Sequence, residues 1–160
     1  MWNRLALVLC VLLALSPVQA QTVGEKAKLN HVDLFDGTRF DPKTVEGKPT
    51  LVYFWASWCP PCRGEMPYLQ QVYDEWASKG LVLLTIDIGE TPATITKYFA
   101  ENNLSLLVLL DTDKEVSQEY GITGVPETFL IDRNGIIRKK QIGAYPDKKT
   151  IENDLSIIMR

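Results

Sequence analysis

Two cysteines separated by only two residues, Cys59 and Cys62, are the part of this 160-residue chain that most clearly predicts chemistry. A disulfide across so short a loop removes little entropy from the unfolded chain, so the spacing favours reversible thiol–disulfide exchange over a structural crosslink. A structural zinc ion needs about four ligands, and the one histidine, His31, lies far from the pair, where we expect a surface residue. The pair therefore predicts a redox-active disulfide that works with no metal and no other cofactor.

The flanking residues predict a buried strand before the cysteines and a helix after them. Residues 51–55 are an uninterrupted apolar run, which is typical of a strand covered on both faces. The apolar residues after the pair recur at helical spacing: Met66, Leu69, Tyr73 and Trp76. At the helix start, free N–H groups and the helix dipole favour a thiolate and lower the pKa of Cys59. We expect Cys59 to be an exposed nucleophile and Cys62, one turn later, to resolve the mixed disulfide.

The rest of the chain alternates strand and helix patterns, which indicates an α/β fold. A small hairpin is expected over residues 29–40, around the Asp36-Gly37 turn. Further strands are expected at residues 81–88, 106–110, 128–131 and 136–142, the last two joined by the Asn134-Gly135 turn. Further helices are expected from Thr91-Pro92, over residues 113–120, and from about Pro146 onward. We predict a mixed central sheet with helices on both faces.

The first 20 residues are typical of a secretory signal peptide. Arg4 supplies a positive start, residues 5–15 are apolar, and Val18-Gln19-Ala20 is a small-residue exit. The apolar run is shorter than the roughly 20 residues of a membrane span, although an uncleaved anchor remains an alternative. We therefore expect cleavage after Ala20, which leaves one domain over residues 21–160 in a periplasmic or other extracytoplasmic compartment. Disulfides form and persist in such compartments.

The charge of the chain argues against nucleic-acid binding. The net charge is −3, and the basic residues are scattered apart from the short run Arg138-Lys139-Lys140. Such a run is usual at a solvated strand end, and a nucleic-acid site would need a larger basic patch.

Residues 54–62 resemble the active-site segment of the thioredoxin superfamily, and most closely its TlpA/ResA/CcmG group of exported, membrane-associated bacterial reductases. Glu65 follows the second cysteine by three residues, as in that group, and Pro67 stands where thioredoxins kink the helix. Residues 124–132 resemble the segment around the superfamily's cis-proline, and residues 91–110 match the group's inserted helix and strand. The resemblance covers residues 27–158. It implies a thioredoxin-like fold with an N-terminal hairpin and a thiol–disulfide oxidoreductase activity.

The resemblance also bears on Glu65. Ordinary thioredoxins carry a buried strand aspartate as proton acceptor where this chain has Tyr53. Cys62 and Glu65 are three residues apart and are therefore neighbours on a helix. A partly buried carboxylate can exchange protons near neutral pH, so we expect Glu65 to be the acid/base for Cys62. The alternative is a solvated helix glutamate.

The resemblance further implies a cis bond between Val125 and Pro126, beside the cysteines. Pro126 would shape a substrate groove, and the Val125 backbone would bind an extended substrate as an added strand. Glu127 either tunes the active site or faces solvent. Trp58 either packs in the core or shields the Cys59 sulfur, and Pro60 and Pro61 complete the active-site surface.

The function that this resemblance implies is the reduction of disulfides in partner proteins such as apocytochrome c during cytochrome c maturation. A membrane thiol reductase would supply the electrons, and the protein would act as a monomer. A disulfide-forming oxidase or isomerase is the catalytic alternative, because the direction depends on a reduction potential that spans roughly −270 to −120 mV in this chemistry. A non-catalytic thioredoxin-like binding module is the alternative of another class. Copper chaperones of this superfamily use a wider cysteine spacing, and the peroxiredoxin pattern Pro-x-x-x-Thr-x-x-Cys is absent.

Overall fold

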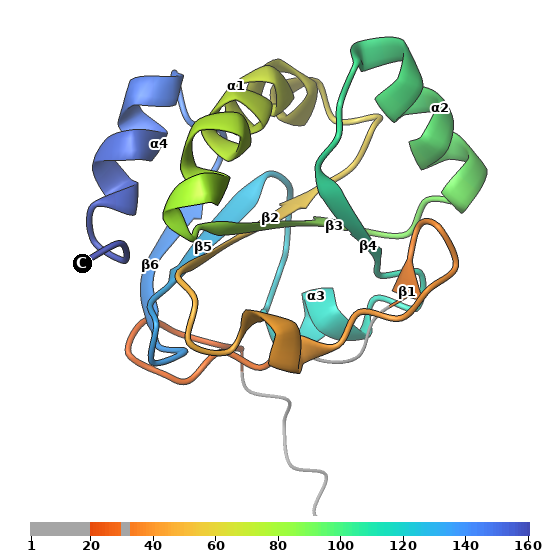
Figure 1. Cartoon of the computed structure of the whole chain (residues 1–160). Coiled ribbons are helices and arrows are strands. Elements are labelled where there is room, and N and C mark those ends of the chain that lie inside the picture. The colour runs from red at the N-terminus through yellow and green to blue at the C-terminus, as the bar shows by residue number, and fades with distance from the viewer. Residues whose placement is uncertain (1–19, 30–32) are drawn as a thin grey trace, which may run out of the picture.

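A computed structural model of the chain, which describes residues 20–29 and 33–160, has a six-stranded mixed sheet (Figure 1). The strands are β1 Asp33–Leu34, β2 Thr50–Trp55, β3 Val82–Asp87, β4 Leu107–Leu110, β5 Glu127–Ile131 and β6 Ile137–Ile142. Their order is β1-β4-β3-β2-β5-β6. Strands β2, β3 and β4 are parallel, whereas β1, β5 and β6 each run antiparallel to a neighbour.

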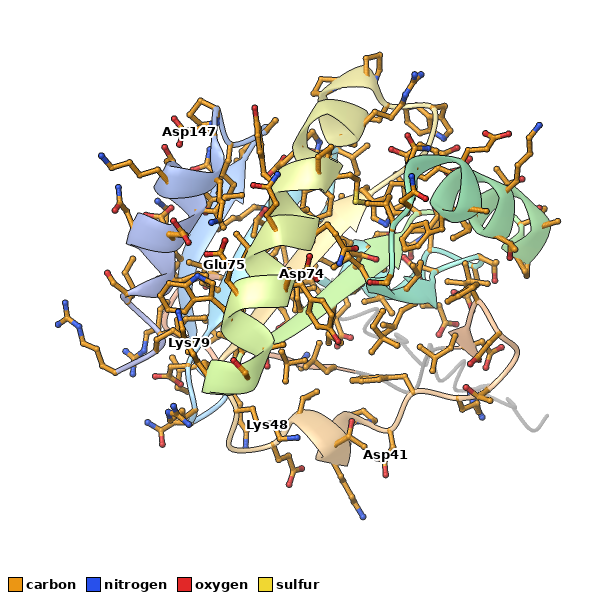
Figure 2. The ribbon with its side chains drawn as sticks, turned by 45° about the horizontal axis from the view of Figure 1, so that its top comes forward. Asp41, Lys48, Asp74, Glu75, Lys79 and Asp147 are labelled. Carbon is orange, nitrogen blue, oxygen red and sulfur yellow. A yellow bond between two sulfur atoms is a disulfide. The ribbon has the colours of Figure 1, made fainter. Side chains whose placement is uncertain are left out.

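Helices cover both faces of this sheet, as predicted. The α-helices are α1 Pro60–Trp76, α2 Pro92–Asn102, α3 Glu115–Glu119 and α4 Lys148–Leu155, and two 3₁₀ helices are η1 Pro42–Val45 and η2 Ala77–Lys79. Helices α1, α2 and α4 lie above the sheet in the view of Figure 1, and α3 and η1 lie below it. Figure 2 shows Glu75 of α1 and Asp147 at the start of α4, and Lys148 Nζ lies 2.5 Å from Glu75 Oε1 across this helix pair.

Strand β2 separates two hydrophobic cores. Leu51, Tyr53 and Trp55 pack beneath α1, and Val52 and Phe54 pack on the opposite face. Every residue of β2 is buried, which explains why this strand reads as a continuous apolar run rather than an alternating one. The strand ends at Trp55, and α1 begins five residues later at this carboxyl end of the strand.

The predicted N-terminal hairpin is less regular than expected in its described residues, 29 and 33–40. Among these residues, Asp33–Leu34 is the one strand, and it pairs with β4. A single bridge joins Asp33 to Arg39, after a tight turn in which the Thr38 carbonyl accepts from the Leu34 N–H. The chain then leaves the sheet because Asp41 caps η1, where Pro42 supplies the first residue.

The signal-peptide interpretation concerns residues 1–19 almost entirely, and these lie outside the described part of the chain, as does His31. The cleavage site and the domain boundary therefore stay predictions. In residues 20–29 and 33–160, no helix combines the length and the apolar character that crossing a membrane requires.

Candidate active site

Cys59 and Cys62 form a disulfide at the start of α1, with their Cα atoms 5.3 Å apart. Cys59 is the N-cap residue, and its Sγ accepts a hydrogen bond from the Cys62 N–H at 3.3 Å. Pro60 and Pro61 occupy the first two helical positions and have no N–H to donate. The first available backbone donor of the helix is therefore the Cys62 N–H, and it points at the Cys59 sulfur. A thiolate at Cys59 is stabilised by this donor and by the helix dipole.

The prediction that Cys59 is exposed is wrong for the disulfide form. Only 2% of Cys59 is accessible, and Cys62 is fully buried. The carbonyl oxygen of Val125 lies 3.6 Å from Cys59 Sγ and covers it from a loop 66 residues away in the sequence. The exposed surface around the cysteines includes Trp58, Pro60 and Pro61.

The Val125–Pro126 peptide bond is cis, as the resemblance implies. Pro126 is buried, and its carbonyl accepts from the Gly143 N–H at 2.9 Å, so its other side is held by the chain after β6. Val125 is half-buried and presents its carbonyl to the Cys59 sulfur. The Cys59–Cys62 segment and the Val125–Pro126 segment thus meet at the end of the sheet where β2 ends and β5 begins.

Glu65 lies inside the protein, so the alternative of a solvated helix glutamate is wrong. It is 1% exposed, and its Oε2 accepts from the Tyr53 hydroxyl at 3.2 Å. Its Oε1 has no hydrogen-bond partner among the described residues, although the nearby Tyr145 backbone N–H favours the charged form. Burial outweighs these favourable contacts and raises the pKa of Glu65 from 4.5 to about 7. Glu65 can therefore gain or lose a proton at neutral pH.

Tyr53 connects Glu65 to the second cysteine. Its hydroxyl lies 3.2 Å from Glu65 Oε2 and 3.4 Å from the carbonyl oxygen of Cys62. Burial, and secondarily the Glu65 carboxylate, raise the pKa of Tyr53 well above its usual range. Tyr53 consequently stays protonated and remains a hydrogen-bond donor at any physiological pH.

For Glu127 and for Trp58, the structure decides between the two alternatives that the sequence left open. Glu127 is 2% exposed and its Oε2 lies 2.7 Å from Lys140 Nζ, so the solvent-facing alternative is wrong. By register Glu127 pairs with Phe54, which places its side chain on the sheet face opposite Tyr53 and Glu65. Trp58 is 64% exposed, so the core alternative is wrong for this residue.

A second carboxylate cluster beside the active-site segment escaped the sequence analysis. Glu90 Oε1 accepts from the Ser57 hydroxyl at 2.6 Å, and Glu90 Oε2 accepts from the Ser57 N–H at 2.5 Å. The Glu90 N–H in turn donates to Asp87 Oδ1 at 2.7 Å. Asp87 is fully buried at the end of β3, and this burial raises its pKa. A hint in the sequence was that polar residues directly follow the buried strand β3, because α/β sites usually lie at the carboxyl ends of the strands.

The site offers sulfur and carboxylate chemistry. Within residues 20–29 and 33–160, no three histidine, cysteine, aspartate or glutamate side chains are grouped so that they could hold a metal ion. The arrangement of a capped cysteine, a buried second cysteine and a neutral-pH carboxyl group suits thiol–disulfide exchange coupled to proton transfer.

The chain is similar to several known proteins. A family model described as the AhpC/TSA family matches residues 23–140. The thiol-disulfide oxidoreductase ResA of Bacillus cereus is 30% identical over 143 residues, which are 89% of this chain and 82% of that protein. ResA of Bacillus subtilis is 31% identical over 112 residues, which are 70% of this chain and 63% of that protein.

Two solved structures share the thioredoxin-like fold. A thiol:disulfide interchange protein of the thioredoxin family from Chlorobium tepidum matches with a TM-score of 0.78 at 27% identity, over 88% of this chain and 100% of that one. StoA from Bacillus subtilis matches with a TM-score of 0.67 at 28% identity, over 78% of this chain and 93% of that one. The predicted fold class is thereby confirmed.

Proposed function

The chain belongs to the AhpC/TSA family and, like its ResA relatives, is a thiol–disulfide oxidoreductase, and from that premise we propose that it is an exported reductant of disulfides in partner proteins. One observation carries the proposal: the Cys62 N–H, the first free donor of α1, is directed at Cys59 Sγ. This favours Cys59 as the attacking thiolate and Cys62 as the resolving thiol.

In the first step the Cys59 thiolate attacks one sulfur of a partner disulfide. The partner S–S bond breaks, and its departing sulfur leaves as a thiolate that takes a proton from solvent. The partner is then joined to Cys59 through a mixed disulfide. Trp58, Pro60 and Pro61 surround the cysteines on the surface, and the Val125 backbone and Pro126 form the opposite side on which an extended partner segment would lie.

In the second step the buried Cys62 thiol gives its proton to the Glu65 carboxylate, and its sulfur attacks Cys59 Sγ. The bond between Cys59 and the partner breaks, and the partner sulfur leaves as a thiolate that receives the proton held by Glu65. Two electrons and two protons have then passed to the partner, and Cys59 and Cys62 are joined. A base inside the protein is needed because Cys62 is fully buried.

The leader-like residues 1–20 support export, and in an oxidising compartment a reductant must be recharged from a membrane thiol carrier. We take apocytochrome c as the partner, since its cysteines must be reduced before haem is attached. Glu127 would tune the site from the opposite sheet face, through its ion pair with Lys140. The redox group would be the disulfide alone, in a monomer.

Trapping tests this proposal. Cys62→Ala leaves Cys59 able to attack but removes the resolving sulfur, so partners accumulate as mixed disulfides on the exported protein. Cys59→Ala is the matched control and should capture none. Recovery of apocytochrome c supports the proposed partner, whereas no covalent partner from cells that express Cys62→Ala contradicts a catalytic role and favours a binding module.

The reduction potential tests the direction of the reaction. A value near the reducing end of the range, about −270 mV, fits a reductant, whereas a value of about −120 mV would identify a disulfide-forming oxidase. Equilibration of the Cys59–Cys62 pair with glutathione or dithiothreitol buffers measures it.

A further inference from the structure

The buried surroundings of Glu65 contain one hydrogen-bond donor, the Tyr53 hydroxyl, to which the reaction steps above assign no role. Glu65 is buried, and among the described side chains the Tyr53 hydroxyl, at 3.2 Å, is the one donor to its carboxylate, besides the nearby backbone N–H of Tyr145. The other carboxylate oxygen has no hydrogen-bond partner among the described residues. Burying a carboxylate costs free energy unless hydrogen bonds replace its lost hydration, so each of these few donors matters for the charged form. The Tyr53 hydroxyl is therefore well placed to influence whether Glu65 holds a proton.

The same hydroxyl has a second acceptor. The Cys62 carbonyl oxygen lies 3.4 Å from Tyr53 Oη, and a phenol has only one proton to donate. When Glu65 is a carboxylate, the charged oxygen is the stronger acceptor. When Glu65 is protonated, that advantage disappears and the Cys62 carbonyl becomes the competing acceptor. One rotation about the Tyr53 C–O bond exchanges these two states.

We propose that Tyr53 is the positioning residue of the proton-transfer step: its hydroxyl holds the carboxylate form of Glu65 beside Cys62 and turns to the Cys62 carbonyl when Glu65 takes the proton. This inference rests on the proposed function, because it assigns Tyr53 a part in the second step. The Tyr53 proton itself is not transferred. Tyr53 instead stabilises one of the two protonation states of Glu65.

The remaining groups around Glu65 do not replace Tyr53. The titratable groups that face Glu65 or lie directly behind it are Cys62 of α1, Tyr53 of β2, Tyr98 of α2, Lys139 of β6, Tyr145, and Asp154 of α4. Tyr145 approaches Glu65 with its backbone N–H, while its hydroxyl donates to Asp154 Oδ2 at 2.9 Å. Asp154 is also paired with Lys139. Among these side chains, Tyr53 alone donates a hydrogen bond to Glu65 in the described structure.

The direct test is a titration of Glu65 in the oxidised protein without any partner. The chain is labelled with ¹³Cδ-glutamate, and the Glu65 carboxyl signal is assigned by its loss in Glu65→Gln. Tyr53→Phe keeps the buried ring and removes only the hydroxyl. We expect the Glu65 midpoint to move upward by about one pH unit, the lower end of what a hydrogen bond to a charged group contributes.

Two further variants separate this role from simple packing. Tyr145→Phe removes a hydroxyl from the other buried tyrosine near Glu65 and should leave the Glu65 midpoint within about 0.2 pH units, because that hydroxyl bonds elsewhere. Site-specific 3-fluorotyrosine at position 53 keeps the hydroxyl and makes it a stronger donor, so the midpoint should fall. It also provides the measurement if Tyr53→Phe does not fold, as judged by near-ultraviolet circular dichroism.

A kinetic readout ties the titration to the reaction. Reduced protein mixed with Ellman's reagent releases one thionitrobenzoate as Cys59 attacks and a second as Cys62 resolves. At pH 7, Tyr53→Phe should slow the second release about fivefold, because the carboxylate fraction of Glu65 falls from about one half to about one tenth. The first release should stay unchanged, and in a Glu65→Gln background Tyr53→Phe should add nothing.

An unchanged Glu65 midpoint in folded Tyr53→Phe, or a fluorotyrosine effect in the same direction as Tyr53→Phe, would overturn the inference. Failure of the proposed function is distinguishable from this result. Cells that express Cys62→Ala would then yield no trapped partner, while the titration of the isolated oxidised protein would still show the Tyr53 effect.

Discussion

Two carboxyl groups, Asp111 and Glu65, are equally buried in this molecule, each 1% exposed, yet their surroundings are opposite. Asp111, between β4 and α3, accepts from the Val116 N–H at 3.0 Å, from the Ser117 N–H at 2.7 Å, and from the Ser117 hydroxyl. Glu65 accepts one hydrogen bond, at 3.2 Å, and has an oxygen without a partner in the described structure.

The difference teaches that the supply of donors, more than burial, separates a structural carboxylate from a reactive one. Asp111 satisfies the free N–H groups at the start of α3, so its charge is stabilised where it stands. Glu65 has lost its hydration and has too few donors to replace it, and its pKa rises to about 7. Its proton is therefore held more tightly than on an ordinary carboxyl group, so that at neutral pH Glu65 can both hold a proton and release it during a reaction.

The largest effect on stability is expected when Asp111, the carboxylate with enough donors, is removed. Asp111→Ala leaves the Val116 and Ser117 N–H groups without an acceptor and leaves the Ser117 hydroxyl only the Lys114 carbonyl at 3.3 Å, and we expect it to lower the free energy of unfolding by about 4 kcal/mol. Asp111→Asn, which keeps one acceptor oxygen, should lose less. Urea unfolding of the oxidised protein at pH 7 measures both, and thionitrobenzoate release per folded molecule should be unchanged. A loss below about 1 kcal/mol in Asp111→Ala would show that its hydrogen bonds do not stabilise the fold.

The next effect has the opposite sign and concerns Glu65. Its pKa is about 7 in the folded state against 4.5 for the free group, so the folded protein binds this proton more tightly. The stability from this group is fully present below about pH 4.5 and is lost as the pH rises through 7, by about 3 kcal/mol in total. Glu65→Gln lacks this loss.

We therefore expect the difference in unfolding free energy between Glu65→Gln and the unchanged chain to increase in favour of the variant from pH 5 to pH 9. Taking this difference removes the contribution of Asp87, whose pKa is also raised by burial and which titrates in both proteins. Urea titrations at each pH provide the measurement. A difference that stays constant across this pH range would contradict the assignment of a titrating Glu65.

The sequence could predict the parts of the molecule that depend on neighbouring residues. The apolar run at 51–55, the helical spacing after it and the Asn134-Gly135 turn gave the order of strands and helices, because burial pattern and turn chemistry are local properties. The Cys59–Cys62 pair and the position of Glu65 one helical turn further on followed in the same way.

Features that depend on contacts between distant segments could not be predicted. Only the family resemblance, and no local pattern, placed Val125 and Pro126 beside the cysteines from 66 residues away, and nothing predicted that Ser57 meets Glu90 from 33 residues away. The pairing of Glu127 with Lys140 depends on the register of β5 and β6, which contains an irregularity near Leu130. A one-residue change of register would turn the side chain to the other face, and nothing in the local sequence decides it.

The smallest expected effect tests whether the comparison extends to Glu90, a carboxylate only partly buried. Both of its oxygens are used, by the hydroxyl and the N–H of Ser57, two residues before Cys59. Ser57→Ala removes one of these two donors while the backbone donor stays and water can approach, so we expect a loss of about 1 kcal/mol in unfolding free energy. Ser156→Ala, which changes an exposed serine that donates to the Asn153 carbonyl at 2.6 Å, is the matched control and should lose less than about 0.5 kcal/mol.

If Ser57→Ala instead destabilised the protein as much as Asp111→Ala, the number of donors left to a carboxylate could not be the property that separates these sites. The explanation would then be that Ser57 holds the loop that carries Cys59 in place, and the first thionitrobenzoate release, which reports Cys59 alone, would slow together with the loss of stability.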